Sequence, residues 1–163
     1  DEISYNQETF INENLDDTEH KGVEASLVVP VHKVLSLFGN ITYSENTFTA
    51  GPNDGKTIPL VPELKAAAGA TLTLSQGFTG TVRINYVGER YFGSDRANEF
   101  KKMDDFITVD LSLNYIWQRF KFFLNANNIF GEKYATWAYA STYGYSYYPE
   151  PEQVVWGGVA VNF

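Results

Sequence analysis

The stretch Ile107-Thr108-Val109-Asp110-Leu111-Ser112-Leu113-Asn114-Tyr115 alternates without interruption between apolar and polar side chains. Successive side chains of a β-strand point to opposite faces, so the odd-numbered residues share one face and the even-numbered residues share the other. An amphipathic helix would instead repeat its apolar residues every three or four positions. The stretch therefore predicts a β-strand with one apolar face and one polar face.

The same alternation recurs along most of the chain. It is found in six further segments, at residues 23–29, 36–44, 68–75, 81–86, 121–127 and 155–163, with Phe123 as an exception. With their flanking residues the segments extend over about 10 to 14 residues, whereas about 5 or 6 is usual in a soluble sheet. Strands of this length suit a tilted crossing of a membrane. The pattern predicts an all-β protein.

The connections between these segments alternate in length. Short ones fall near residues 30–33, 76–78 and 118–119, and long ones fall near residues 7–19, 47–62, 93–104 and 131–152. Short turns at one rim and long loops at the other are typical of outer-membrane β-barrels, whose long loops face outward. A soluble β-sandwich, such as a carbohydrate-binding domain, would also alternate in sequence but needs neither feature. We therefore expect an antiparallel transmembrane β-barrel.

The composition narrows the possible functions. The chain has 163 residues, no cysteine and a formal net charge of -8, so we expect no disulfide scaffold, no cysteine-ligated metal and no nucleic-acid partner. Aromatic residues make up 16% of the chain and include 11 tyrosines, a residue type that collects at membrane interfaces. No apolar run approaches the ~20 residues of a membrane helix. The length of apolar runs does not detect barrel strands, because their apolar and polar residues alternate.

The sequence offers no catalytic or cofactor site. It contains no nucleophile motif of the Gly-x-Ser-x-Gly kind and no glycine loop that would cradle a phosphate. The two histidines, His20 and His32, lack metal-site spacing, and we expect them at opposite rims. We therefore predict that the chain is not an enzyme and holds neither a cofactor nor a metal.

The first residues indicate a sequence cut from a longer one. Residues 1–6 are short for a spanning strand and are interpreted as the outer end of a strand that starts upstream. A closed barrel needs an even number of strands and no free edge, which seven full strands alone do not give. No basic region followed by an apolar stretch opens the chain, so we expect no signal peptide in it.

Three stretches resemble the TonB-dependent outer-membrane receptors. Asn128-Ile129-Phe130-Gly131-Glu132-Lys133-Tyr134 is similar to the Asn-Leu-Phe-Asp-Lys-Lys-Tyr segment that leaves the family's penultimate strand. Tyr86-Val87-Gly88-Glu89-Arg90-Tyr91 is similar to one of its strand ends. Tyr148-Pro149-Glu150-Pro151, followed by a strand that stops at Phe163, is similar to its C-terminus, and Lys21-Gly22-Val23-Glu24 is a weaker match.

The matches keep the family's order and spread over most of the chain. One departure is Glu152-Gln153, at the positions where the family often has Gly-Arg after the Pro-rich segment. The departure puts in doubt an arginine-mediated contact inside the barrel wall, and it leaves the strand assignment unchanged.

The resemblance implies that residues 1–163 are the C-terminal portion of a larger barrel. The whole barrel would have about 22 strands, of which this chain would supply about eight, and the plug domain would lie outside it. The resemblance further implies a bacterial outer-membrane location and TonB-dependent uptake of a scarce nutrient such as a ferric siderophore, cobalamin or a glycan. The implied partners are outer-membrane lipid, the barrel-assembly machinery, the rest of the receptor with its plug, and TonB, which acts through the missing N-terminal part.

The loop from Tyr134 to Tyr148 is the candidate ligand-facing segment. It carries rigid aromatic rings spaced by small residues, a combination that gives contact surface at low entropic cost. We expect ligand contacts from Trp137, Tyr139, Tyr143 and Tyr145. The alternative is that these rings form the upper aromatic girdle of the barrel or pack against neighbouring loops.

The chain end carries a second candidate site. By family resemblance, Val159, Val161 and the terminal Phe163 form the signal that the barrel-assembly machinery recognises. The same alternating residues would face lipid in any barrel.

A different function class remains open at this stage. A small autonomous barrel of about eight strands, with a structural or adhesion role, would have about this length. The short first strand and the receptor-like stretches count against this alternative.

Overall fold

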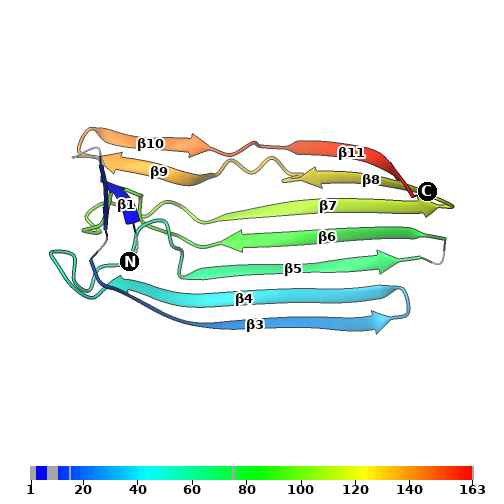
Figure 1. Cartoon of the computed structure of the whole chain (residues 1–163), viewed down its shortest axis with the longest axis horizontal. Coiled ribbons are helices and arrows are strands. Elements are labelled where there is room, and N and C mark those ends of the chain that lie inside the picture. Colours follow the sequence, from blue (N-terminus) through cyan, green and yellow to red (C-terminus); the bar gives the residue numbers. More distant parts are fainter. Residues whose placement is uncertain (1–2, 7–10, 15, 75, 163) are drawn as a thin grey trace.

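The computed structural model describes residues 3–6, 11–14, 16–74 and 76–162, which fold into antiparallel β-strands joined by turns and loops (Figure 1). The strands are β1 (Ile3–Asn6), β2 (Ile11–Asn14), β3 (Thr18–His32), β4 (Leu35–Phe48), β5 (Leu64–Thr73), β6 (Phe78–Val87), β7 (Phe106–Trp117), β8 (Phe120–Asn127), β9 (Ala135–Ser141), β10 (Gly144–Pro149) and β11 (Val154–Val161). Within the described residues, no helix has the length and apolar character needed to span a membrane.

The long strands of this described part form one main sheet of seven strands. Their order is β11-β8-β7-β6-β5-β4-β3, and every neighbouring pair is antiparallel. Five of the seven alternating segments lie entirely within these strands. The other two lie mainly in β5 and β11, with residues 74 and 162 beyond the strand ends and residues 75 and 163 outside the described residues. The predicted strands are confirmed. The short turns gather at one end of the sheet and the long connections at the other (Figure 1). We name these ends the turn rim (residues 33–34, 76–77 and 118–119) and the loop rim (residues 49–63, 88–105 and 128–153).

Two short hairpins lie at the loop rim. β1 pairs with β2, and β9 pairs with β10, which extends the hairpin of β8 and β11 outward (Figure 1). The expectation that residues 131–152 form a loop is therefore wrong for most of that segment. Residues 137–140 and 145–147 alternate aromatic with small side chains, and Trp and Tyr favour strands, so a second hairpin forms above the first.

One face of the main sheet, here named the apolar face, carries only apolar side chains and glycine through its central rows. The register aligns on it Val23, Ala25, Leu27 and Val29 of β3, Leu37, Gly39 and Ile41 of β4, Ala66, Ala68 and Ala70 of β5, Val82, Ile84 and Tyr86 of β6, Ile107, Val109, Leu111 and Leu113 of β7, Leu124 and Ala126 of β8, and Val155, Gly157 and Val159 of β11. Val23 is 71% exposed and Val155 is 67% exposed. Soluble monomers rarely expose contiguous apolar surface of this extent.

The opposite face, here named the polar face, carries hydrogen-bonding side chains. Asn85 Nδ2 donates to Asp110 Oδ2 at 2.8 Å, and the hydroxyls of Thr71 and Thr81 lie 3.1 Å apart on neighbouring strands. Aromatic rings interrupt this face, and two of them occupy the space above a glycine on the neighbouring strand. Phe38 lies over Gly69, and Phe123 lies over Gly158.

Aromatic rings line the apolar face at the turn rim. Tyr115 stacks on Phe122 with ring centroids 6.4 Å apart, and Trp117 stacks on Phe120 at 6.1 Å. From Tyr115 to Ile107 the strand β7 rises about 26 Å at ~3.3 Å per residue, close to the ~25 Å apolar band of outer-membrane barrels. An aromatic girdle at one edge and an apolar band of this height are the features of a membrane-facing wall.

The buried hydrophobic side chains lie away from the apolar face. Among the described residues, Ala67 is the one buried in the middle of the main sheet, while Phe48, Ile58, Phe92 and Met103 are buried at or near the loop rim. No second layer of the described residues covers the apolar face, as a soluble β-sandwich would require. The alternative of a soluble sandwich is therefore not supported by the packing.

The glycines of the wall predict different tolerances to substitution. A Cβ added at Gly69 would lie 2.3 Å from the carbonyl oxygen of Val82 and 2.4 Å from Phe38, whereas one added at Gly39 would meet Ala67 O at an ordinary 3.5 Å. We expect Gly69→Ala to lower the free energy of unfolding by about 1–3 kcal/mol and Gly39→Ala to change it by less than about 0.5 kcal/mol. Urea unfolding in lipid vesicles, followed by tryptophan fluorescence, measures both. Equal stability of the two variants would contradict the close packing described at Gly69.

Candidate functional site at the loop rim

The loop rim has a hydrophobic core of its own. Phe92, Met103, Ala138 and Ala140 are buried together there, with Leu60, Phe100 and Ala135 packed against them. These residues come from three separate connections, so the core ties the loops 49–63 and 88–105 to the β9–β10 hairpin. We name it the loop-rim core.

Two polar side chains join separate segments of the loop rim. Each one hydrogen-bonds to both the backbone N–H and the backbone C=O of a single residue, as a neighbouring strand would. Asn98 donates from Nδ2 to Thr57 O at 3.0 Å, and its Oδ1 accepts from Thr57 N at 2.7 Å. Ser94 Oγ donates to Ala140 O at 2.8 Å and accepts from Ala140 N at 3.0 Å. Each side chain satisfies both backbone groups of its partner, which an exposed loop would otherwise leave to water.

Asp95 fixes the conformation of the loop segment that contains Ser94 and Asn98. Its side chain is 2% exposed, and its two oxygens accept from the backbone nitrogens of Glu99 at 2.8 Å and Phe100 at 3.0 Å. A carboxylate that accepts backbone N–H groups of its own turn fixes the path of the chain. The segment from Ser94 to Phe100 therefore has a defined conformation that its own hydrogen bonds stabilise.

Arg90 lies buried beneath the loop-rim core without a carboxylate partner among its described hydrogen bonds. Its Nη1 donates to Gly88 O at 3.4 Å and Asp104 O at 3.5 Å, its Nη2 donates to Ala135 O, and its guanidinium lies 5.2 Å from the centre of the Phe106 ring. Burial lowers the pKa of Arg90, but a guanidinium keeps its charge in proteins. Arg90 thus connects the end of β6, the start of β7 and the start of β9.

The segment that resembles the receptor family forms a closed turn after β8. Asn128 donates from Nδ2 to Glu132 O at 2.8 Å and accepts at Oδ1 from Glu132 N at 2.9 Å. Its backbone nitrogen donates to Asp110 Oδ1 at 2.9 Å, which anchors the turn to the polar face. Gln153, at the position where the family often has arginine, donates from Nε2 to Ile129 O at 2.9 Å. The two arms of the terminal hairpin are therefore joined by a glutamine at this position.

The four predicted ligand-facing aromatics do not converge on one point. The pairing of β9 with β10 puts Tyr145 on the hairpin face that carries Ala138 and Ala140, and its ring stacks on Phe92 at 5.0 Å. Trp137 and Tyr139 lie on the opposite face, where Trp137 packs edge-on against Tyr148 at 4.6 Å. Tyr143 lies at the hairpin tip and is 99% exposed.

A polar hollow of 640 Å³ opens between the loops. Pro52 and Asn53 line it from one connection, Arg96 and Glu99 from the next, and Tyr139 from the hairpin. Of the four predicted aromatics, Tyr139 is the one that lines this hollow. The role of all four in ligand contact stays a prediction.

The remaining candidate residues are placed as follows. Val159 and Val161 lie on the apolar face near the C-terminus, and Phe163 lies outside the described residues, so the assembly signal stays a prediction. His20 and His32 lie at opposite ends of β3, as expected. His20 Nδ1 lies 2.7 Å from Asn46 Oδ1, and His32 Nδ1 accepts from Val34 N at 3.4 Å. The described residues contain no cluster of three or more histidine or acidic side chains suited to a metal.

Four residues that organise the loop rim were not predicted from the sequence, namely Arg90, Ser94, Asp95 and Asn98. The turn-forming residues Gly93, Ser94, Asp95 and Asn98 gave a local signal in the sequence, and Asn98 adopts a positive φ of 56° in the structure. The partners Thr57 and Ala140 are 41 and 46 residues away in sequence, and no periodicity connects them.

Comparison with known proteins decides the family. A family model described as TonB dependent receptor-like, beta-barrel, matches residues 1–129 of the chain. The chain belongs to the TonB-dependent receptor family. This confirms the family resemblance and the antiparallel barrel fold. The family consists of receptors and transporters rather than enzymes, which confirms that prediction as well.

Solved structures of uptake receptors and of a transporter share this fold. The ferric yersiniabactin uptake receptor FyuA from Yersinia pestis is 20% identical, with 90% of this chain and 24% of that chain covered and a TM-score of 0.76. The ferric-catecholate import receptor Fiu from K12 E. coli is 19% identical, with 99% and 23% covered and a TM-score of 0.71. The copper transporter OprC is 18% identical, with 99% and 27% covered and a TM-score of 0.74.

The chain spans about a quarter of the length of these structures. At these identities the likeness shows the fold, and it does not carry a ligand from one receptor to another. Among curated proteins, none matches the chain in sequence. TonB-dependent receptors contain a plug, interact with TonB and lie in the outer membrane of Gram-negative bacteria.

The Asn98 clamp gives a prediction for the mobility of the loop rim. Asn98→Gly removes both hydrogen bonds to Thr57, while glycine accepts the φ of 56° without strain. We expect the amide of Thr57 to exchange with deuterium about 10-fold faster, as the loss of one to two net hydrogen bonds predicts. Ala97→Gly adds backbone freedom without removing a side-chain hydrogen bond and is the control. An unchanged Thr57 exchange rate in Asn98→Gly would contradict the clamp.

Proposed function

We propose that this chain forms part of the wall and outer surface of an outer-membrane importer, which takes up a scarce nutrient with energy supplied through TonB. In this proposal residues 1–163 belong to the C-terminal portion of the barrel, and the plug lies in another part of the receptor. The importer's other partners are surrounding lipid and the machinery that assembles the barrel, for which Val159, Val161 and Phe163 carry the signal.

The apolar face of the main sheet is the observation that carries this proposal. Across seven strands, its central rows present no charged or amide side chain, while the polar face holds Asn85 and Asp110. A bilayer requires that backbone hydrogen bonds be satisfied within the protein, and strands do this by pairing laterally. An apolar outside with a polar inside is the arrangement of a barrel that encloses water or a plug.

A ferric siderophore is the ligand class that the similar receptors favour. FyuA is described as a ferric yersiniabactin uptake receptor, Fiu as a ferric-catecholate import receptor and FecA as a ferric citrate transporter. OprC is described as a copper transporter, and it shares the fold equally well. Cobalamin and glycans remain further candidates within the same mechanism.

The outer surface offers two kinds of ligand contact. Tyr143 projects from the β9–β10 tip into the surroundings, and Tyr139 borders the polar hollow beside Arg96. A rigid ring next to a guanidinium suits an anionic, partly aromatic chelate, since the ring offers a stacking surface and the guanidinium offers a permanent positive charge with a planar set of donors. Trp137 and Tyr145 support the hairpin from its two faces.

Membrane placement predicts opposite responses on the two faces of β6. Val82 lies on the apolar face and Thr81 on the polar face. We expect Val82→Arg to destabilise the folded barrel by about 2–4 kcal/mol, as arginine does on a lipid-facing position near the bilayer centre. Thr81→Arg should change stability far less, because its guanidinium reaches the polar interior. Urea titration of the barrel in phospholipid vesicles measures both variants, and equal destabilisation would refute the assignment of the faces.

Ligand contact predicts an uptake defect for Tyr139 and Tyr143. We expect Tyr139→Ala combined with Tyr143→Ala to raise the KM for uptake by about 10-fold, the loss typical of aromatic interface residues. Cells that carry the receptor would be supplied with radioactive iron as a catecholate complex and, separately, as a citrate complex. Phe130→Ala is the control, since Phe130 is another exposed aromatic, in the turn after β8. Unchanged uptake of both complexes in the double variant, with normal receptor levels, would remove these residues from the ligand site.

A further inference from the structure

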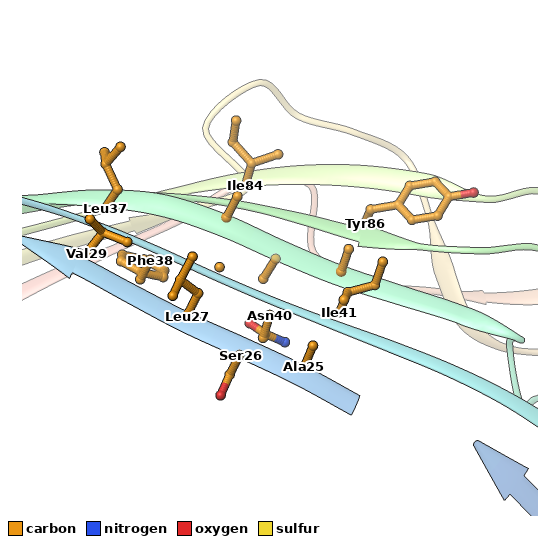
Figure 2. A pocket seen from close by; sticks show the side chains of 14 residues that line it. Ala25, Ser26, Leu27, Val29, Leu37, Phe38, Asn40, Ile41, Ile84 and Tyr86 are labelled. Carbon is orange, nitrogen blue, oxygen red and sulfur yellow. The ribbon is translucent and has the colours of Figure 1, made fainter. Parts of the chain in front are cut away.

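A hollow of about 630 Å³ interrupts the apolar face over strands β3 to β6 (Figure 2). Its volume lies within the ~300–1,000 Å³ of typical small-molecule sites. Its surface is almost entirely apolar, with Leu27 and Val29 on one side and Ile84 and Tyr86 on the other. It is open to the surroundings on the side that faces away from the polar interior.

The strand register explains why the hollow forms here. One row across the sheet reads Leu27, Gly39, Ala68 and Ile84, with two small residues between two large ones. The next row reads Ala25, Ile41, Ala66 and Tyr86, and again places an alanine beside larger side chains. The floor therefore lies close to the backbone, while branched and aromatic side chains rise around it.

The position of the hollow restricts what fills it. An apolar depression in a membrane-facing wall is in contact with hydrocarbon and not with water. The side chains that line the hollow gain dispersion contacts only from a hydrocarbon chain of matching width. A gap of about half an ångström between the two surfaces already loses about a quarter of the van der Waals attraction. A lipid acyl chain has this chemistry and is present at high local concentration.

The charged residues near the two ends of the hollow determine at which end the lipid headgroup would lie. Val29 and Leu37 line the hollow nearest the turn rim, each four residues from Lys33, or about 13 Å along the strand. The turn rim carries Lys33 and Arg119 and no acidic residue. Towards the loop rim, Lys21 lies opposite Glu45 and Lys102 is paired with Glu63, so these lysines already have carboxylate partners. A negatively charged phosphate is therefore favoured at the turn rim over the opposite end.

We propose that this hollow is a specific lipid site, which seats one acyl chain of an anionic phospholipid whose phosphate lies at the turn rim beside Lys33. The site rests on the membrane placement in the proposed function, and it goes beyond it by separating one bound lipid from the general lipid boundary. Leu27, Gly39 and Ala68 form the acyl contact, and Lys33 selects the headgroup.

The test uses the complete cellular protein that carries this sequence, reconstituted in vesicles of phosphatidylethanolamine and phosphatidylglycerol. The probe is phosphatidylglycerol with a photoactivatable diazirine in its acyl chain, and labelled peptides are located by mass spectrometry. We expect labelling to concentrate on the hollow, at Leu27, Leu37, Ile84 and Tyr86, above that of Leu111 and Val155 elsewhere on the apolar face.

Gly39→Val adds a side chain at the floor of the hollow, and its Cβ would lie at an ordinary 3.5 Å from Ala67 O. We expect labelling of the hollow to fall about five-fold, which corresponds to about 1 kcal/mol of lost contact. Ala70→Val is the matched control, because Ala70 lies on the apolar face outside the hollow. Lys33→Gln should keep the acyl labelling by a phosphatidylethanolamine probe and reduce that by the phosphatidylglycerol probe. Heat-modifiable migration in gels establishes that each variant is folded.

The outcomes separate this inference from the proposed function. Equal labelling over the whole apolar face, unchanged by Gly39→Val, would overturn the specific site and leave the membrane placement intact. Absence of labelling from every apolar-face peptide would overturn both. A hollow that stays unlabelled while its surroundings are labelled would mean that protein, such as a second copy of the receptor, covers it, and the lipid proposal would be wrong.

Discussion

Lateral backbone hydrogen bonding is the constraint on which the rest of this structure depends. In hydrocarbon each unpaired N–H or C=O group costs several kcal/mol, so each strand has to lie between two partners. Once pairing fixes the register, the two-residue repeat assigns each side chain to lipid or to the interior. The unbroken apolar face and the hydrogen-bonded polar face are two consequences of that one requirement.

The wall and the loop rim are stabilised by different means. The wall exposes its apolar side chains and gains stability from backbone pairing and, in the proposed membrane placement, from contact with lipid. The loop rim buries Phe92 and Met103 and is closed by side chains that imitate backbone pairing, as Ser94 does for Ala140. One short chain therefore combines a region packed like a membrane protein with a region packed like a water-soluble protein. The buried Arg90 connects the two regions, because it reaches the strands below and the hairpin above.

The sequence predicted the wall well and the loop rim poorly, for a physical reason. Alternation such as that of Ile107–Tyr115 is a local property, and lipid on one side makes it strict. The family stretch that begins at Asn128 was also visible, because its turn closes on itself within five residues. The clamp of Asn98 on Thr57 depends on two loops meeting in space, and neither loop has a repeat that shows its partner. The β9–β10 hairpin was missed because its aromatic residues were interpreted as loop surface rather than as strand formers.

The terminal hairpin is interrupted at the same height in both arms, by residues 128–134 on one side and 150–153 on the other. Below the break β8 and β11 keep a regular register, and above it β9 and β10 keep another with a shift at Pro149. An inserted or deleted residue in the upper hairpin is therefore absorbed at the break and does not exchange the inside and outside of the strands below. The upper hairpin can change length and composition over evolutionary time, or accept a grafted peptide tag, while the wall beneath it stays sealed.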